Sequence, residues 1–174
     1  MATLISGSTG VNKITDGTIA EADFASGVRT NTPSFSCYSG AHVALPYDTP
    51  TKMTYSVQEW DTDNSITQGT GTTDNRFIVP TGGAGKYQFN YGGHMTFSDG
   101  GSYHLLMQIK KNGTLMHENW SANNAEQRSY VAASTTIDLA EGDYVEIFAS
   151  QSRNVSTLFV YGGQNLKFQG WKLT

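Results

Sequence analysis

Short stretches in which apolar and polar residues alternate recur along the chain from residue 33 onward. The clearest covers residues 85–91, where Tyr87, Phe89 and Tyr91 alternate with lysine, glutamine and asparagine. A strict period of two is typical of a strand that buries one face. We therefore predict a strand here, with its three aromatic side chains packed against a second layer.

Similar patterns, bounded by glycine, proline and asparagine, predict the other strands. They cover residues 35–45, 52–60, 76–80, 103–111, 114–120, 129–139, 144–150 and 166–173. Asn112-Gly113 separates two of them and suits a type I′ hairpin turn, which requires positive φ twice. We expect residues 61–75 to form a surface loop or an irregular edge excursion, and residues 153–163 to form a loop. Roughly nine or ten strands result, which indicates a sandwich of two sheets.

The composition supports an all-β domain. Only 15% of the residues are charged, and 19 of the 174 residues are glycine. Long helices need many alanine, leucine, glutamate and lysine residues, whereas this chain is rich in threonine, tyrosine and phenylalanine. A chain of this length is typical of one domain with one core. We expect almost no helix.

Residues 1–32 follow a different pattern. Isolated apolar residues stand between glycine, serine, threonine and aspartate, without a helical or strand period. Such a segment cannot bury a core of its own, so it is either a disordered leader or an extended arm that becomes ordered on a partner. We predict the arm, with residues 33–174 as the head domain and a possible helical turn or two from a capping box at Thr18. Its expected anchors are Leu4, Ile5, Val11, Ile14, Ile19 and Phe24.

Charge and cysteine content exclude several classes of partner. The net charge is −4, and Lys110-Lys111 is the only basic doublet, so nucleic acid is not expected to bind. No apolar run approaches the ~20 residues of a membrane span, and the first residues do not resemble a secretory signal. The single cysteine, Cys37, excludes an internal disulfide framework and is expected to be a buried thiol.

Candidate catalytic and metal-binding residues are few. Glu59, Asp61 and Asp63 alternate loosely like the start of a calcium loop, but Ile66 occupies the position that requires glycine, so they are weak metal candidates only. No nucleophile elbow, phosphate-binding loop or paired-cysteine pattern occurs. We predict that the chain is not an enzyme and needs no cofactor. We expect structural roles for the histidines, each on a different predicted strand: His42, His94, His104 and His117. We expect the tryptophans to pack rather than to bind sugars: Trp60, Trp120 and Trp171.

Several short motifs follow one another in a characteristic order. They are Phe77-Ile78-Val79-Pro80, Gly85-Lys86-Tyr87-Gln88-Phe89, Gln108-Ile109-Lys110-Lys111-Asn112-Gly113, Ile137-Asp138-Leu139 with Gly142-Asp143-Tyr144-Val145, and Phe168-Gln169-Gly170-Trp171-Lys172-Leu173. In this order they resemble the globular head of the complement and tumour necrosis factor superfamily. The resemblance implies a ten-stranded jelly roll that forms a tight homotrimer, with one sheet of each subunit facing its neighbours. Core and trimer packing is then expected from Tyr87, Phe89, Tyr91, Tyr130, Phe168 and Trp171.

Residues 8–19, Ser-Thr-Gly-Val-Asn-Lys-Ile-Thr-Asp-Gly-Thr-Ile, resemble leaders of bacteriophage virion proteins. This resemblance implies a structural protein of a phage particle, assembled in the bacterial host cytoplasm. Our first hypothesis is a trimeric capsid decoration or cement protein whose arm grips the major capsid protein. The alternative is the receptor-binding tip of a short tail fibre, with residues 61–75 and 154–163 recognising a host surface glycan.

Overall fold

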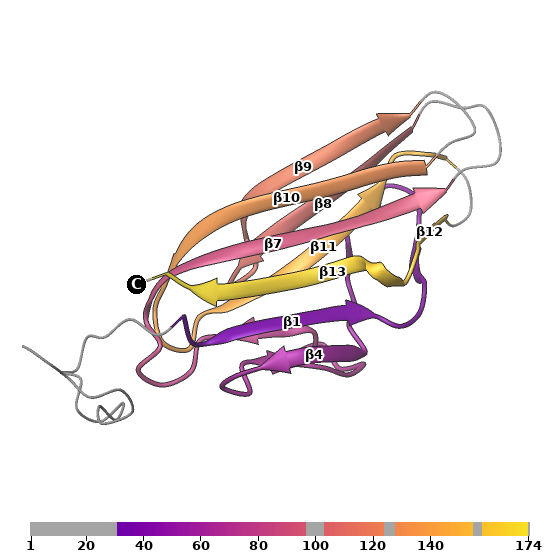
Figure 1. Cartoon of the computed structure of the whole chain (residues 1–174). Coiled ribbons are helices and arrows are strands. Elements are labelled where there is room, and N and C mark those ends of the chain that lie inside the picture. The colour runs from indigo at the N-terminus through magenta and orange to yellow at the C-terminus, as the bar shows by residue number, and fades with distance from the viewer. Residues whose placement is uncertain (1–30, 97–102, 124–127, 155–157, 174) are drawn as a thin grey trace, which may run out of the picture. The chain divides into compact units, whose positions relative to one another are not determined.

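The computed structural model describes residues 31–96, 103–123, 128–154 and 158–173, which form two packed antiparallel sheets and no helix (Figure 1). Sheet 1 contains β1 (Ser34–Ser39), β2 (Val43–Leu45), β4 (Val57–Asp61), β7 (Gly85–Thr96), β10 (Arg128–Leu139), β12 (Leu158–Val160) and β13 (Gly163–Lys172). Sheet 2 contains β3 (Thr51–Lys52), β5 (Ile66–Thr67), β6 (Arg76–Ile78), β8 (Tyr103–Lys111), β9 (Thr114–Asn123) and β11 (Tyr144–Gln151). The predicted all-β class is confirmed, while the predicted arm lies outside the described residues.

The strand order shows that the chain passes repeatedly from one sheet to the other. In sheet 1, β7 lies between β10 and β13, and β13 leads through β1 to β4. In sheet 2, β11 lies between β6 and β8, and β9 follows β8. Strands β9 and β10 are consecutive in sequence but belong to different sheets. Strands β7, β10 and β13 therefore form one broad, continuous surface, as Figure 1 shows.

Aromatic side chains fill the space between the sheets. Phe35, Phe89 and Phe168 point inward from sheet 1, and Phe77 meets them from sheet 2. The ring centroids of Phe35 lie 5.1 Å from Phe77 and 4.8 Å from Phe168, which are favourable distances for aromatic pairs. The predicted burial of Cys37 is confirmed, and burial raises the pKa of its thiol far above the ordinary value. This cluster forms the centre of the core.

The position of Gly170 explains why the final sequence motif contains a glycine. A Cβ atom at this position would lie 2.7 Å from ring atoms of both Phe35 and Phe89. The backbone of β13 thus passes directly against the aromatic cluster, and glycine is required by this close approach.

Two predicted strands are each divided in the structure. The stretch 52–60 separates into β3, which pairs with β11 of sheet 2, and β4, which pairs with β1 of sheet 1. Met53 and Tyr55 between them are buried, so their alternation reflects a crossover through the edge of the core rather than one strand. The stretch 35–45 divides into β1 and β2, because the chain turns away from β13 after Ser39.

The two long segments predicted as loops contain strands. Residues 61–75 include β5, which extends sheet 2 as an irregular edge strand beside β6. The buried Asn75 supports this excursion, since its side chain accepts a hydrogen bond from the Tyr55 amide and donates one to the Gly69 carbonyl. Residues 153–163 include β12, which pairs with β2, so the prediction of an uninterrupted loop there is wrong. Of these two short pairings, the one between β12 and β2 joins segments that are distant in sequence.

The two turn motifs of the sequence meet in space. Asn112 and Gly113 have φ values of 49° and 80°, as the predicted type I′ turn requires. The Asp143 carboxylate accepts hydrogen bonds from the Asn112 side chain and the Ala140 amide, and it lies 2.8 Å from Lys111 Nζ. These contacts lower the pKa of Asp143 to about 2, the Lys111 hydrogen bond being the largest cause. One carboxylate thus connects the β8–β9 hairpin to the turn before β11.

Replacing Asp143 by asparagine should remove this stabilisation. Because the folded-state pKa is below the ordinary value, the contribution is present above about pH 4 and disappears as the pH falls toward 2. We expect D143N to lower the free energy of unfolding by about 1–2 kcal/mol at pH 7 and by almost nothing at pH 2. Denaturant titrations at the two pH values test this, with the exposed D138N as control. A loss of stability of the same size at pH 2 would contradict the assignment of this stabilisation to the Asp143 carboxylate.

Replacing Gly170 by alanine should strain the core. The added methyl group must displace two phenylalanine rings, so we expect G170A to lower the free energy of unfolding by about 2 kcal/mol. Replacing one of these phenylalanines by the smaller leucine should relieve part of the clash. The double variant G170A/F89L is therefore expected to lose less stability than the sum of its single variants, as measured by thermal unfolding. Strictly additive losses would show that the close approach is not the cause.

Candidate functional site

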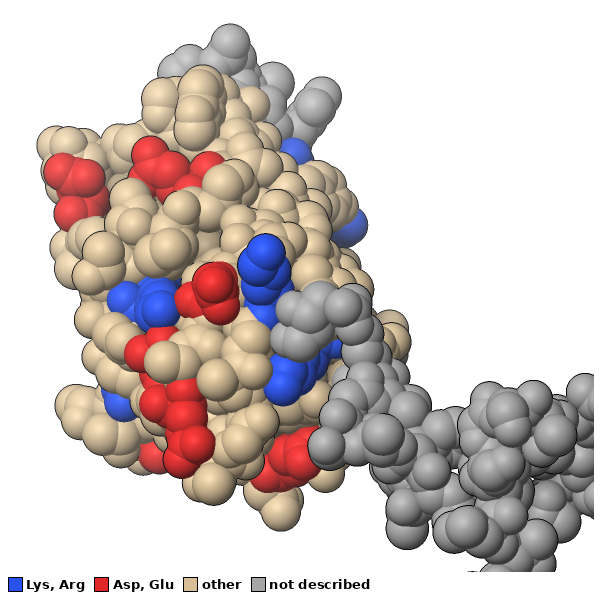
Figure 2. Space-filling model, turned by 90° about the vertical axis from the view of Figure 1, so that its left-hand side faces the viewer, with Lys and Arg blue, Asp and Glu red and all other residues tan. Residues whose placement is uncertain are grey.

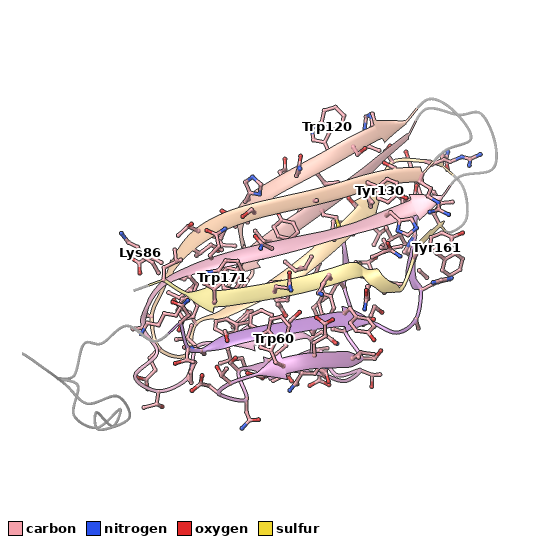
Figure 3. All side chains as sticks on the ribbon, viewed as in Figure 1. Trp60, Lys86, Trp120, Tyr130, Tyr161 and Trp171 are labelled. Carbon is pink, nitrogen blue, oxygen red and sulfur yellow. The ribbon has the colours of Figure 1, made fainter. Side chains whose placement is uncertain are left out.

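The outward surface of sheet 1 consists mainly of uncharged polar side chains along its central strands. We call this surface, defined by the outward residues of β7, β10 and β13, the neutral face. Tyr130, Ala132, Ser134 and Thr136 follow one another at alternate positions along β10. Most charged residues on these strands lie toward the strand ends, as Lys86 does at the end that also carries Trp171 (Figure 3), whereas Lys167 lies in the middle of β13.

A chain of side-chain hydrogen bonds joins β10 to β7 on this face. The Thr136 hydroxyl donates to Gln88 Oε1 at 2.8 Å, and the Gln88 amide donates to Ser134 Oγ. Ser134 in turn donates to Asn90 Oδ1 at 2.8 Å. Each internal member donates one bond and accepts another, so these groups are held in fixed positions.

A second chain of contacts crosses β13, β1 and β4. The Gln169 amide donates to Ser36 Oγ at 3.0 Å, and Ser36 donates to Glu59 Oε2. Lys167 Nζ lies 2.8 Å from the same carboxylate oxygen. The pKa of Glu59 is lowered by the hydrogen bond from Lys167 and then by that from Ser36. The Glu59–Lys167 ion pair therefore brings no net charge to this part of the face.

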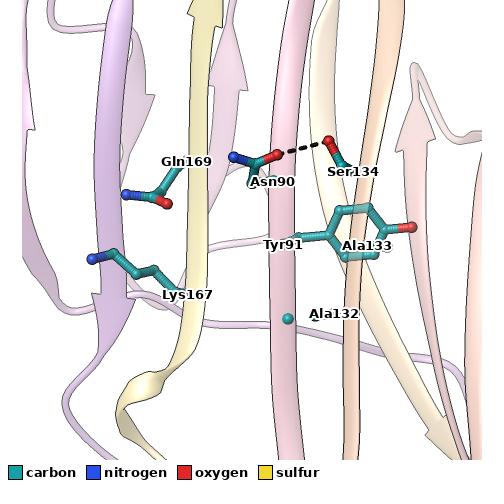
Figure 4. Close-up of a pocket in the computed structure, with 8 residues that line it drawn as sticks. Asn90, Tyr91, Ala132, Ala133, Ser134, Lys167 and Gln169 are labelled. Atoms are coloured by element: carbon teal, nitrogen blue, oxygen red, sulfur yellow. Dashed lines mark hydrogen bonds between the residues drawn. The ribbon is translucent and has the colours of Figure 1, made fainter.

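A shallow hollow of about 430 Å³ lies between the two chains of contacts (Figure 4). Its rim carries Asn90 and Ser134 on one side and Lys167 and Gln169 on the other, while Gly92 and Ala132 supply no long side chain. A Cβ atom on Gly92 would lie 2.8 Å from the Val131 carbonyl oxygen. Close approach of β7 and β10 thus requires glycine there. The hollow can receive a side chain from another surface.

Aromatic and imidazole rings cluster at the opposite end of the face from Trp171. His94 is only 4% exposed and lies between Tyr130 and Tyr161, with both ring centroids 5.1 Å away. His42 packs on the other side of Tyr161 at 4.5 Å. Burial lowers the pKa of His94, and the nearby charges of Arg128 and His42 lower it further. The cluster therefore favours neutral His94, and it leaves Tyr130 55% exposed beside it.

The outward surface of sheet 2 has a different character. Glu146 forms ion pairs with Lys52 at 3.0 Å and Arg76 at 2.8 Å, and Lys110 Nζ lies 4.1 Å from the centre of the Phe148 ring. Near the end of the molecule shown in Figure 2, acidic and basic side chains are interspersed rather than gathered by sign. The charged side chains around Glu146 are thus paired with one another and largely buried.

The predicted packing residues separate into two groups. Tyr87, Phe89, Tyr91 and Phe168 are buried in the core, whereas Tyr130 and Trp171 lie on the neutral face. Sequence reasoning missed the hollow itself, although the small residues at alternate positions of β10 offered a signal. His42 precedes β2 rather than lying on a strand, which corrects one expectation about the histidines.

The weak metal candidates have other partners. Asp61 accepts hydrogen bonds from the amides of Ser65 and Ile66 and so closes a turn, while Glu59 contacts Ser36 and Lys167. The Asp63 carboxylate accepts a hydrogen bond from Thr62. Among the described residues, no three histidine, cysteine, aspartate or glutamate side chains gather as a metal site. Within the same part of the chain, no helix is long and apolar enough to span a membrane.

Comparisons with known proteins agree on the fold. No protein-family model and no curated protein sequence matches the chain. Among solved structures, the globular domain of zebrafish complement 1qA protein aligns with a TM-score of 0.53 at 18% identity, over 82% of this chain and 98% of that one. Eiger TNF from S. frugiperda aligns with a TM-score of 0.55 at 10% identity, over 81% of this chain and 92% of that one. The described part of the chain therefore has the jelly-roll fold of the complement and tumour necrosis factor heads, as the motif order predicts.

Proposed function

We propose that the chain forms a homotrimer through its neutral face and that the trimer is a structural component of a bacteriophage particle, where it decorates and stabilises the capsid shell. The neutral face is the observation that supports the trimer. Its amide and hydroxyl groups are already fixed by hydrogen bonds, and Gly92 and Ala132 in its hollow carry no long side chain. Complementary docking of such a surface needs little ordering of side chains.

Aromatic side chains and a compensated ion pair suit the neutral face to contact with another subunit. The centres of protein interfaces are depleted in charged residues and enriched in aromatic ones. The neutral face carries the aromatic side chains of Tyr130 and Trp171 toward its two ends (Figure 3), and Lys167 beside its hollow pairs with Glu59, so this pair brings no net charge to the surface.

The role in the particle rests on the sequence of residues 1–32. Three identical arms on one trimer would bind neighbouring capsid proteins together, because the second and third arms act at high effective concentration. Weak individual anchors such as Ile14 and Phe24 are then sufficient for firm attachment. The major capsid protein is the partner that this arrangement fits best.

The receptor-binding tip of a short tail fibre is the second candidate. Of its proposed glycan loops, residues 61–75 are held by internal bonds, such as those from the Gly71 amide to Asp74 and from Arg76 to the Thr72 carbonyl. Residues 155–157 of the other loop lie outside the described residues. The exposed Trp120 on sheet 2 is the observation that favours a glycan-binding role.

Light scattering of the purified chain tests the trimer. We expect three subunits at micromolar concentration and a monomer after Ala132→Arg, because the long cation fills the hollow on the neutral face. Ala132 is exposed on one subunit, so the thermal unfolding of an isolated subunit should change little. The matched control is M116R, at an exposed position of sheet 2, which should remain trimeric. A wild-type monomer, or a trimer that survives A132R, would contradict the proposed surface.

Copy number tests the location in the particle. We expect quantitative mass spectrometry of purified particles to find on the order of hundreds of copies, in a multiple of three, because a site on the shell is repeated many times. A chain that lacks residues 1–32 should remain trimeric but bind emptied capsids at least about tenfold more weakly. A few copies per particle would favour the tail fibre, and undiminished capsid binding by the truncated chain would refute the arm as anchor.

A further inference from the structure

A second hollow lies on the outward surface of sheet 2, at the end where β11 finishes. We call it the Trp120 hollow; its volume is about 250 Å³. The residues that line it are Asp48, His104, Leu106, Trp120, Ser150, Gln151 and Ser152. None of them belongs to the neutral face, so this hollow is independent of the proposed trimer and arm.

Strand register explains the arrangement of the hollow. Ser150 pairs with Leu106 across β11 and β8, and Leu106 pairs with Trp120 across β8 and β9. These three side chains therefore form one row on the same face. Leu106 is half-buried in the middle of the row, and Trp120 is 58% exposed at one side. The row is therefore recessed and apolar at Leu106, and the ring of Trp120 forms an aromatic wall beside it.

The indole of Trp120 is supported from within the protein. Its ring centroid lies 4.9 Å from that of His104, and the two planes are inclined by 52°. Figure 3 shows Trp120 projecting from β9 on the side away from β7. Packing against His104 orients this ring, and Trp120 remains 58% exposed and accessible to a ligand.

Asp48 forms the opposite side of the hollow on a fixed segment. Its amide donates to the Gln151 carbonyl at 2.9 Å, and its φ of 46° is unusual for a residue other than glycine. Pro46 and Pro50 flank it, and the Thr49 hydroxyl donates to the Tyr47 carbonyl. The backbone that carries the Asp48 carboxylate is thus held in place before any ligand binds. Ser152 adds a hydroxyl that is positioned by a hydrogen bond from the His104 amide.

We infer that the Trp120 hollow binds a neutral pyranose sugar. A pyranose ring has an apolar C–H face that can stack on the indole and a rim of hydroxyls that can donate to a carboxylate. The lining residues include no lysine or arginine, and the Asp48 charge disfavours anionic sugars. The volume is below the ~300 Å³ at which typical ligand pockets begin, which fits one sugar unit rather than a long chain.

Saturation-transfer NMR on the full chain tests the inference, with the methyl pyranosides of glucose, galactose, mannose and N-acetylglucosamine as probes. We expect at least one probe to bind with a Kd of about 1–10 mM, as is usual for a small, solvent-exposed site. W120A should weaken binding at least about tenfold, and W120F should weaken it less because a ring remains. D48N, which keeps the size of the side chain, should weaken binding about three- to tenfold by removing the charged acceptor.

The matched control is W60A. Trp60 is also exposed, at 48%, but it lies on β4 of sheet 1. Its replacement should leave sugar binding unchanged, and thermal unfolding should confirm that every variant is folded. The inference is overturned if no probe binds at about 50 mM. It is equally overturned if W120A binds as tightly as the wild type, or if W60A loses binding to the same extent.

Discussion

The aromatic contact between the two sheets, centred on Phe35, Phe77, Phe89 and Phe168, determines what the outer surfaces can present. Side chains alternate along a strand, so each residue committed to this core sends its neighbours outward. Burial of Tyr87, Phe89 and Tyr91 thereby places Gln88 and Asn90 on the neutral face. Shifting the register of β7 by one residue would turn the aromatic side chains outward and turn Gln88 and Asn90 toward the core.

The outer surfaces of the two sheets are suited to different contacts. The neutral face has fixed amides and hydroxyls, a hollow beside Gly92 and Ala132, and compensated charge, which are features of a surface that packs against protein. The outer surface of sheet 2 has a largely buried group of ion pairs around Glu146 and an aromatic-walled hollow, which suits contact with small polar ligands. In the proposed trimer the first surface is buried and the second faces outward.

Local pattern was sufficient to predict most strands and one turn. Alternation located the start of β7, and Asn112-Gly113 located the hairpin between β8 and β9, because both signals depend only on neighbouring residues. The division of residues 51–61 between the sheets could not be predicted, since it depends on strands β1 and β11 far away in the sequence. The alternating pattern of Met53 and Tyr55 is the same for a crossover as for a strand.

The candidate sites were predictable only in part. Tyr130 and Trp171 were expected to pack, but the sequence alone could not separate them from the buried Tyr87 and Phe168, because aromatic residues serve cores and interfaces equally well. The Trp120 hollow depends on Asp48 and Ser150, which lie about a hundred residues apart in sequence and meet because the segment of Tyr47 and Asp48 bonds to Gln151 at the end of β11. Sequence spacing contains no signal for such a meeting.

The trimer through the neutral face is the central claim, and an experimental structure of the assembled full-length protein tests it most directly. We predict three copies around one axis, with Asn90, Ala132 and Gln169 of each copy buried against its neighbours and Trp120 facing solvent. An assembly in which these three residues remain in solvent, while the outer surface of sheet 2 makes the contacts, would contradict it.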